Sequence, residues 1–230
     1  MGGWGEQGEA PPDATLRSFY ATLLASFGPQ KWWPARTRWE VIWGAILTQN
    51  TTWRNATLAL KNLRRAGLLA WRSLRQTSLR ELELLIRPAG FYRQKARTLR
   101  NFMDWIGQAH GGSLDSLFSL GAAPARSQLL ALKGIGPETA DAILLYAGRQ
   151  PVFVADAYTR RVLARHGLLS PAADYYSAQR FLHQHLPPDA ALFNEFHALL
   201  VEAAKRFCHR NVAHCEHCPL GVFLERDSKL

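Results

Sequence analysis

The stretch LKGIGPETADAILLYA, residues 132–147, decides the fold class of this sequence. Two glycines, Gly134 and Gly136, bracket an isoleucine, and we expect a turn too tight for side chains at either position. Pro137 suits the first position of the following helix, where no backbone N–H is needed. Backbone N–H groups at such a turn can approach a phosphate closely, although an ordinary turn between two helices has the same pattern. The open question is why a carboxylate, Glu138, follows at once.

Helical periodicity extends in both directions from this turn. Before Gly28, apolar and aromatic residues recur at helical spacing, namely Leu16, Phe19, Tyr20, Leu23, Leu24 and Phe27. Comparable patterns, separated by Gly, Pro or capping residues, cover 38–49, 52–67, 78–90, 94–112, 125–134, 137–148, 157–167, 175–186 and 192–208. The segment 150–156 is short enough to be a connector between helices. The sequence therefore predicts an all-α fold with short loops.

The balance of charge limits the partners of the chain. The 230 residues carry a formal net charge of +10. Such an excess favours a polyanion, because binding releases counterions, although charge that serves only solubility is the alternative. The sequence has no basic start followed by an apolar segment, and no apolar run near the ~20 residues that span a bilayer. We therefore expect a cytosolic protein that does not enter a membrane.

Further motifs agree with the turn. They are ILTQNTTW (46–53), IRPAGFYRQKA (86–96), VADAYTRRVL (154–163) and CHRNVAHCEHC (208–218). Together with the turn they make the sequence resemble the helix-hairpin-helix base excision DNA glycosylases of the endonuclease III superfamily. The resemblance extends from about Trp32 to Cys218. The segment KWWP (31–34) and the glutamate after GIGP are most similar to the bacterial 3-methyladenine DNA glycosylase branch.

The resemblance implies a fold and a division into domains. Members are all-α, with two lobes and a cleft between them. We expect residues 31–147 to form a helical bundle that contains the hairpin at 124–147. Residues 1–30 and 148–230 then form the second lobe, which includes the cysteine loop. DNA is expected to lie over the hairpin, with the lesion in the cleft.

The resemblance also assigns the chemistry. Asp156 occupies the position of the family's catalytic aspartate. Bifunctional members carry a lysine at the position of Glu138, and its amine attacks the sugar to form a Schiff base. A carboxylate cannot do this, so the resemblance implies a monofunctional enzyme in which water attacks and Asp156 stabilises the oxocarbenium-like centre. From the residues alone, Asp156 is a plain N-cap, and Glu138 is an acid that the helix dipole favours in the first turn.

A base pocket follows from the same resemblance. Glu138 at this pocket favours a positively charged base, such as 3-methyladenine, over a neutral base. Trp32, Trp33 and Pro34 are expected to form a wall on which the base stacks. Gln49 is the candidate wedge that fills the gap left by the flipped nucleotide. The alternatives are a hydrophobic staple at a helix start for the tryptophans and a plain loop amide for Gln49.

Several residues are candidates for contact with the DNA backbone. Lys133, Gly134 and Gly136 belong to the hairpin itself. Arg93 and Lys95 follow the turn at Gly90 and are expected to touch phosphate. Taken singly, such charges are more typical of a solvated helix face.

The three cysteines of the chain, Cys208, Cys215 and Cys218, stand close together near the end of the sequence. Their clustering indicates metal ligation rather than a disulfide framework. The spacing matches the first three ligands of the superfamily's [4Fe–4S] loop, but Leu224 stands where the fourth cysteine belongs. Three interpretations stay open: a cluster with a non-cysteine ligand, a Cys3His zinc site, or a loop without metal. The histidines that could complete either site are His209, His214 and His217.

These observations favour a base excision repair glycosylase that acts as a monomer on double-stranded DNA containing a damaged base. We expect it in the cytoplasm, associated with the nucleoid. Two alternatives remain. One is a bifunctional, endonuclease III-like glycosylase and AP lyase that acts on oxidised pyrimidines. The other is a catalytically silent hairpin module that binds duplex DNA.

Overall fold

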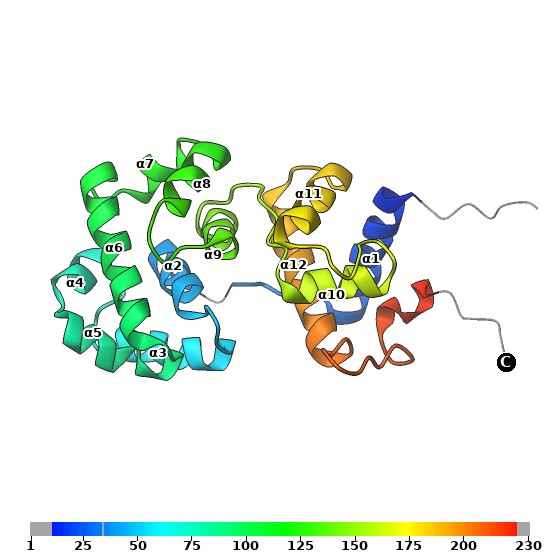
Figure 1. The fold of residues 1–230 in the computed structure, drawn as a ribbon, viewed down its shortest axis with the longest axis horizontal. Coiled ribbons are helices and arrows are strands. Elements are labelled where there is room, and N and C mark those ends of the chain that lie inside the picture. Colours follow the sequence, from blue (N-terminus) through cyan, green and yellow to red (C-terminus); the bar gives the residue numbers. More distant parts are fainter. Residues whose placement is uncertain (1–10, 34, 225–230) are drawn as a thin grey trace, which may run out of the picture. The chain divides into compact units, whose positions relative to one another are not determined.

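The structure is a computed structural model that describes residues 11–33 and 35–224. These residues form helices joined by short loops (Figure 1). Their only β contact is an isolated bridge between Cys208 and Ala213. The all-α prediction is therefore confirmed. No helix in the described ranges has both the length and the apolar content that a bilayer-spanning helix needs.

The chain divides into two compact units. Unit 1 takes the residues up to Gln30, Ala155–Pro188 and the residues from Glu195 onward, and unit 2 takes Lys31–Val154 with Asp189–Asn194. The expected boundary lay at 147. In the structure the connector 150–154 belongs to unit 2, where Val152, Phe153 and Val154 are buried.

Unit 2 is a bundle built around a helix that is buried on nearly all sides. That helix, α2 (Arg38–Leu47), is apolar around most of its circumference, and its residues 40–47 are buried. Its Trp43 packs edge-on against Phe102 of a long neighbouring helix, with the ring centroids 5.9 Å apart. The other helices of the bundle are α3 (Trp53–Arg65), α4 (Trp71–Gln76), α5 (Leu79–Leu85), η1 (Arg87–Ala89), α6 (Tyr92–His110), α7 (Leu114–Phe118), α8 (Ala122–Leu130), α9 (Pro137–Ala142) and the π-helix η2 (Ile143–Ala147).

Two of these helices, α4 and α7, are absent from the expectations drawn from sequence. Each has at most six residues, so neither offers enough turns for an apolar period to be recognised. Ser113 caps α7 through its side chain, which accepts a hydrogen bond from the Ser116 N–H. Tertiary packing stabilises such short helices, through Leu74 in α4 and through Leu114, Leu117 and Phe118 in α7.

Unit 1 packs its helices around the N-terminal one. Leu16, Phe19 and Leu23 of α1 (Pro12–Phe27) are fully buried, which confirms the apolar face predicted for this segment. The Phe19 ring lies against His166 and Phe223, with centroids at 4.9 and 5.0 Å. The remaining elements are α10 (Ala157–Arg165), α11 (Tyr175–His185), the greater part of α12 (Ala190–Arg206) and η3 (Pro219–Phe223).

The hairpin between α8 and α9 needs glycine at one position only. Gly134 has a φ of +95°, and a Cβ there would lie 2.2 Å from the Thr98 hydroxyl of α6. Gly136 instead has an ordinary φ of −94°, and a Cβ there meets nothing within 4 Å. The expectation that both glycines are sterically required is thus wrong for Gly136. Within the described residues, nothing lies close enough to restrict a side chain at that position.

A buried ion pair holds the two helices of the hairpin together. The Arg126 guanidinium of α8 donates to both carboxylate oxygens of Asp141 in α9, at 2.6 and 3.0 Å. The side chain of Asp141 is fully buried. Two parallel hydrogen bonds of this kind fix the relative orientation of the helices as well as their distance.

Candidate functional site

Asp156 is held in a fixed direction at the start of α10. One of its carboxylate oxygens accepts a hydrogen bond from the Thr159 N–H at 2.8 Å, so the residue is the N-cap of this helix. The other oxygen lies 3.4 Å from Nε2 of His197 in α12. The side chain keeps 13% of its surface exposed. The carboxylate is therefore immobilised at both oxygens and still accessible.

The surroundings of Asp156 keep it ionised. Burial favours the neutral acid and opposes ionisation. The neighbouring charge of His197 and hydrogen bonds from His197 and Thr159 outweigh burial, and they lower the pKa of Asp156 below its ordinary value. A carboxylate that is ionised, fixed and partly exposed can stabilise a developing positive charge.

The hairpin borders an open hollow of about 470 Å³, which we call the hairpin hollow. Its walls are the hairpin segment 134–139 and the loop residues Gln49 and Asn50. Glu138, in the first turn of α9, is an exposed part of this wall. The structure thus brings together three of the predicted positions, Gly134, Gly136 and Glu138, with Gln49.

The side chain of Gln49 is not free within this hollow. Its amide nitrogen donates two hydrogen bonds, both 2.9 Å long, to the Gly134 carbonyl and the Thr139 hydroxyl. Neighbouring Asn50 is exposed and has a φ of +50°. The loop therefore turns one amide onto the hairpin and the other outward.

The prediction that Lys95 contacts DNA is wrong. Lys95 is only 2% exposed, and its ammonium group donates to the backbone carbonyls of Leu47 and Ala89, both at 2.8 Å. The residue lies on the buried face of α6, three positions before Thr98, rather than on the solvated face. Burial lowers the pKa of Lys95 to about 8. Its role in the described structure is to tie the end of α2 to the turn before α6.

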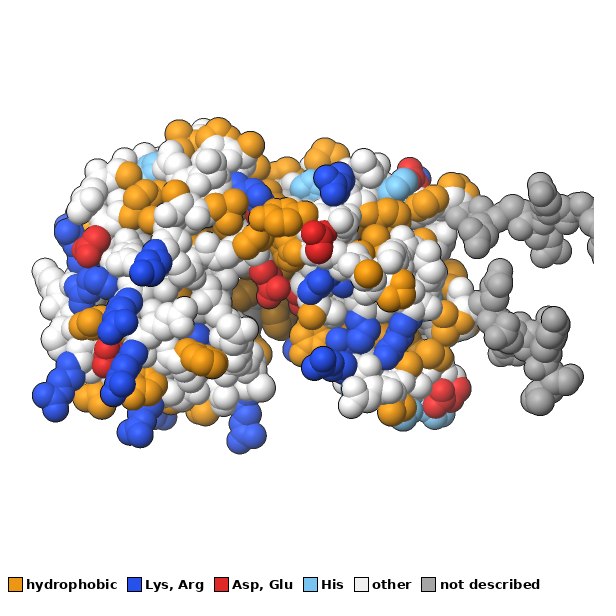
Figure 2. All heavy atoms as spheres, in the orientation of Figure 1, with side chains coloured by type: hydrophobic (Ala, Val, Ile, Leu, Met, Phe, Trp, Pro, Cys, Tyr) orange, Lys and Arg blue, Asp and Glu red, His pale blue; other side chains and the backbone are white. Residues whose placement is uncertain are grey.

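The surface beside Lys95 offers other groups. Phe91 is 66% exposed at a φ of +46°, and Arg93 is exposed with its guanidinium 5.7 Å from the Tyr92 ring. Lys133 of the hairpin is also exposed. Figure 2 shows lysine and arginine side chains gathered over α3, α5 and α6, with few acidic ones on that face. Such a surface suits a polyanionic partner.

A second cavity of unit 2, which we call the aromatic pocket, has a volume of about 720 Å³. Trp33 lies edge-on to Trp53, at 4.8 Å between ring centroids, and 5.1 Å from Tyr146 of η2. Trp32 adds its ring at 5.6 Å from Trp53. A Cβ on Gly44 would come within 2.9 Å of the Trp33 ring, so the ring packs against α2 at a position where the helix carries no side chain. Pro34, the third residue predicted for this wall, lies outside the described residues.

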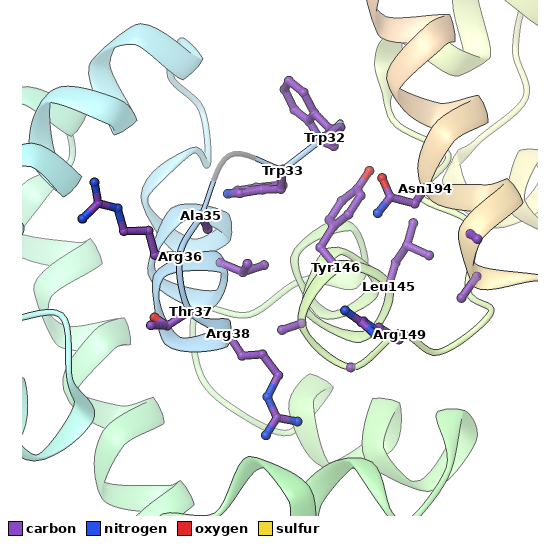
Figure 3. Close-up of a pocket in the computed structure, with 15 residues that line it drawn as sticks. Trp32, Trp33, Ala35, Arg36, Thr37, Arg38, Leu145, Tyr146, Arg149 and Asn194 are labelled. Carbon is purple, nitrogen blue, oxygen red and sulfur yellow. The ribbon is translucent and has the colours of Figure 1, made fainter. Parts of the chain in front are cut away.

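Polar groups complete the aromatic pocket. The indole N–H of Trp33 and the side-chain carbonyl of Asn194 are buried, and neither has a hydrogen-bond partner among the described residues. Figure 3 shows Tyr146 and Asn194 pointing toward each other, whereas the guanidinium groups of Arg36 and Arg38 point away from the aromatic rings. The pocket therefore combines an aromatic wall with the buried N–H donor of Trp33 and the buried carbonyl acceptor of Asn194.

The predicted residues are divided between these two cavities. Trp32 and Trp33 line the aromatic pocket, and Glu138 and Gln49 line the hairpin hollow. Glu138 and Tyr146 are eight residues apart on the continuous run of α9 and η2, which is about 12 Å of helical rise. Within unit 2, both cavities thus border the same helical run.

Three contributing residues were not predicted from sequence. His197 lies on the apolar side of its helix, where a lone histidine gives no signal until the structure brings Asp156 to it. Tyr146 lies at the end of the hairpin stretch 132–147, where nothing in the pattern marks it, and Asn194 falls in a helical segment with no motif. Only contacts between distant parts of the chain could have identified them.

The cysteine loop, residues 208–223, is anchored to unit 1 by protein contacts. The guanidinium of Arg165 donates to the Cys208 sulfur at 3.0 Å and to the Arg210 carbonyl at 3.1 Å. Arg161 donates to the Cys208 carbonyl at 2.6 Å. The ring of His166 lies 3.2 Å from the Leu220 carbonyl. Helix α10 thus holds both ends of the loop.

The residues of this loop do not fit a four-thiolate iron–sulfur cluster. Leu224 is present at the fourth ligand position, and the chain has no further cysteine. Across the described ranges, no group of three or more His, Cys, Asp or Glu side chains is arranged to hold a metal ion. His214 and His217 each lie 3.7 Å from the Glu216 carboxylate instead of completing a ligand set. Burial raises the pKa of the Cys218 thiol in the free loop.

An all-helical chain whose Gly-Ile-Gly hairpin is followed by an aspartate-capped helix falls in the class of helix-hairpin-helix DNA repair proteins. Comparison with known proteins identifies the family. Residues 43–188 match the model of the HhH-GPD superfamily base excision DNA repair proteins. The chain is also 42% identical over 209 residues to MJ1434 of Methanocaldococcus jannaschii, which is named provisionally as a DNA repair glycosylase. That match covers 90% of this chain and 94% of the relative. The chain therefore belongs to the HhH-GPD superfamily and is a base excision repair DNA glycosylase.

More distant relatives and solved structures agree. Endonuclease III of Sulfolobus acidocaldarius is 27% identical over 80% of this chain and 79% of its own length. The 3-methyladenine DNA glycosylase MagIII of H. pylori, solved with 1,N6-ethenoadenine, superposes with a TM-score of 0.73 at 28% identity, covering 84% of this chain and 97% of that one. An endonuclease III trapped covalently on DNA gives 0.79 at 20% identity, covering 94% and 97%, which supports the fold alone.

Proposed function

We propose that this glycosylase is monofunctional: it hydrolyses the N-glycosidic bond of a damaged base flipped from duplex DNA and leaves the strand uncut. The observation that carries the proposal is Glu138 in the first turn of α9. Among the residues that line the hairpin hollow there is no lysine. A carboxylate cannot form a Schiff base with deoxyribose, so water is left as the nucleophile.

Asp156 is the catalytic residue in this proposal. As the bond to the base breaks, positive charge develops on the sugar, and an ionised carboxylate stabilises it. Its fixed direction supports this role, because the Thr159 N–H and His197 hold one oxygen each. The same carboxylate can orient the attacking water. Asp156 does not need to lose a proton first, since its lowered pKa keeps it ionised.

The substrate class that fits best is a base carrying positive charge, such as 3-methyladenine or another purine alkylated on a ring nitrogen. A cationic base is a good leaving group and needs little acid assistance. Aromatic faces attract cations by about 1–2 kcal/mol when desolvated. The walls of Trp33 and Tyr146, from which the guanidinium groups of Arg36 and Arg38 point away, support this choice. The likeness to the H. pylori 3-methyladenine glycosylase supports it as well.

The free polar atoms of the aromatic pocket and the charge of Glu138 complete the recognition. The Trp33 N–H and the Asn194 side-chain carbonyl have no hydrogen-bond partner among the described residues, and both residues belong to the lining of this pocket. Glu138 is exposed, so its contribution in the free protein is screened by water. It becomes effective only when DNA covers the hairpin hollow and excludes that water.

The decisive test concerns the nucleophile. Incubation with DNA methylated by a simple alkylating agent, followed by borohydride, should trap no covalent complex and should release free base. Asp156→Asn should abolish release and retain binding to the same DNA. A trapped complex, through Lys133 or any other lysine, would instead establish a bifunctional enzyme.

A second experiment tests the charge of the substrate. Glu138→Gln should slow excision of 3-methyladenine more than excision of a neutral lesion such as 1,N6-ethenoadenine. Equal effects on both lesions would exclude a role for the Glu138 charge in choosing the base. Unchanged excision of both lesions by Glu138→Gln would show that Glu138 takes no part in the site.

The endonuclease III relatives keep one alternative in view, a glycosylase and AP lyase that acts on oxidised pyrimidines. A panel of duplexes, each with a single lesion, separates the two by the identity of the freed base. Salt-sensitive binding without release from any lesion would identify the third alternative, a catalytically silent module.

A further inference from the structure

The segment between α1 and α2 carries two indoles of the aromatic pocket, and we call its described residues 30–33 and 35–37 the tryptophan loop. Within this loop the Ala35 N–H donates to the Trp33 carbonyl at 2.8 Å. The next N–H, that of Arg36, donates to Oε2 of the Glu40 carboxylate in α2 at 2.9 Å. The backbone beside Trp33 is therefore tied first to itself and then to a side chain of the following helix.

Glu40 differs from an ordinary helix-capping acid. It is the third residue of α2, and Thr37 caps this helix by accepting the Glu40 N–H at 3.2 Å. In a capping box the acid bonds back to the N–H of the capping residue itself. Here the carboxylate bonds one residue further back, to Arg36, and it is buried. Helix α5 begins with the same pattern, Ser78 followed by Glu81, yet Glu81 is exposed. The start of a helix therefore does not require the acid to be buried.

The burial of Glu40 is compensated by α3. Its side chain is only 2% exposed, and a buried carboxylate is costly unless it is paired. The other oxygen, Oε1, forms an ion pair with the guanidinium of Arg64 in α3. The same helix begins with Trp53, whose ring contacts the indoles of both Trp32 and Trp33. Helix α3 thus supports the tryptophan loop twice, at its backbone through Glu40 and at its rings through Trp53.

The placement of Trp33 shapes the aromatic pocket. Its ring packs against α2 at Gly44, where a Cβ would come within 2.9 Å, and its centroid lies 5.1 Å from that of Tyr146. A shift of the loop backbone moves this ring relative to both neighbours. The wall of the pocket therefore depends on the contacts that hold the loop.

We propose that Glu40 is a positioning residue for recognition of the base: its carboxylate, paired with Arg64, fixes the tryptophan loop so that Trp33 stands as a wall of the aromatic pocket. The proposal rests on the function proposed above at one point, namely that this pocket receives the base. It does not depend on which nucleophile attacks the sugar.

Three variants separate this role from the capping of a helix. Glu40→Met keeps the length of the side chain and removes both the acceptor and the charge, and Arg64 stays hydrated because its side chain is 40% exposed. Glu40→Gln keeps an oxygen that can accept the Arg36 N–H. Glu81→Met is the matched control, because it removes the acid at the same position of the exposed pattern in α5.

The first measurement uses the protein alone. Hydrogen exchange of the Arg36 amide should be at least about tenfold faster in Glu40→Met than in wild type, which corresponds to about 1.4 kcal/mol of lost local stability. Glu40→Gln should stay within about threefold of wild type, because its oxygen replaces the lost acceptor. Glu81→Met should leave this amide unchanged. Unchanged exchange in Glu40→Met would overturn the proposal.

The second measurement is the affinity for free 3-methyladenine, determined by equilibrium dialysis. Glu40→Met should bind the base about tenfold more weakly than wild type, because a displaced wall loses contact with it. Glu40→Gln should recover most of this loss, and Glu81→Met should bind like wild type. Wild-type affinity in Glu40→Met, or an equal loss in Glu81→Met, would show that Glu40 only stabilises a helix and would overturn the proposal.

The third measurement is a double-mutant cycle on the single-turnover rate of excision from alkylated duplex DNA. If Glu40 acts through Trp33, Glu40→Met should slow wild type by about tenfold but should change the rate little in a Trp33→Ala background. Equal factors in both backgrounds would overturn the proposal. Failure of the underlying function looks different: a wild type that binds no free base and excises unchanged after Trp33→Ala would refute the aromatic pocket as the base site, and with it this role of Glu40.

Discussion

The hairpin of unit 2 and the cysteine loop of unit 1 are both segments that the sequence marks as functional, yet they are held in different ways. The hairpin keeps both glycines of its motif, the side chain of Gln49 in the loop after α2 donates two hydrogen bonds to it, and Thr98 of α6 lies close to Gly134. The cysteine loop lacks one ligand of its motif, and guanidinium groups of α10 hold it instead. The comparison teaches that a motif predicts the path of the backbone more safely than the agent that stabilises it.

The largest expected effect tests the internal support of the hairpin. Arg126→Met should lower the free energy of unfolding by about 3–5 kcal/mol, because it leaves the fully buried carboxylate of Asp141 without its cation. Denaturant titration measures this. The matched control is Arg38→Met, which removes an ion pair to Asp115 whose side chains are 44% and 83% exposed. The control should cost less than about 1 kcal/mol, and equal costs would show that burial of the pair is unimportant.

Lys95 gives the next largest effect, and it appears as a dependence on pH. The pKa of Lys95 is about 8 in the folded protein, whereas the ordinary lysine value, which we take for the unfolded chain, is 10.5. Between these values the unfolded chain binds more protons, so stability rises with pH as the cost of burying the charge disappears. The free energy of unfolding of wild type, measured relative to that of Lys95→Met, should therefore increase by up to about 3 kcal/mol between pH 8 and 10.5.

The design of the Lys95 experiment removes other titrations, because every other lysine and tyrosine is present in both proteins. Below pH 8 the difference between the two proteins should be constant. A difference that is flat over the whole range would mean that the Lys95 ammonium keeps an ordinary pKa, and a shift of opposite sign would mean that its two carbonyl partners outweigh burial.

Much of the fold followed from the sequence because helical periods and glycine stops are local signals. The face of α1 and the turn at Gly134 are examples. Lys95 shows where this reasoning fails. Its motif places it beside exposed residues of α6, but only the packing of α2 against α6 reveals that it points inward. The partner of Asp156 was out of reach for the same reason, because His197 is 41 residues further along the chain.

The two glycines of the hairpin give a smaller and sharper contrast. Gly134→Ala should cost about 2 kcal/mol, because a side chain at a φ of +95° is strained and its Cβ would meet Thr98. Gly136→Ala should change the melting temperature little, since its φ is ordinary and the space around it is open. If Gly136→Ala nevertheless weakens binding to duplex DNA, the restriction at this position comes from the nucleic acid. A large loss of stability in Gly136→Ala would contradict the described geometry.

The smallest effect on stability is expected in the cysteine loop, where the [4Fe–4S] motif alone would predict the largest. A loop whose fold depends on a bound metal loses its support when the metal is removed, but here Arg165 supplies two hydrogen bonds to the loop from within the chain. Arg165→Ala should therefore lower the free energy of unfolding by about 1–2 kcal/mol. Prolonged treatment of the wild type with an iron and zinc chelator should leave the melting temperature and the far-ultraviolet circular dichroism unchanged. A chelator that destabilises the protein more than Arg165→Ala does would show that the three cysteines hold a metal after all, because no protein contact of the loop is sensitive to chelation.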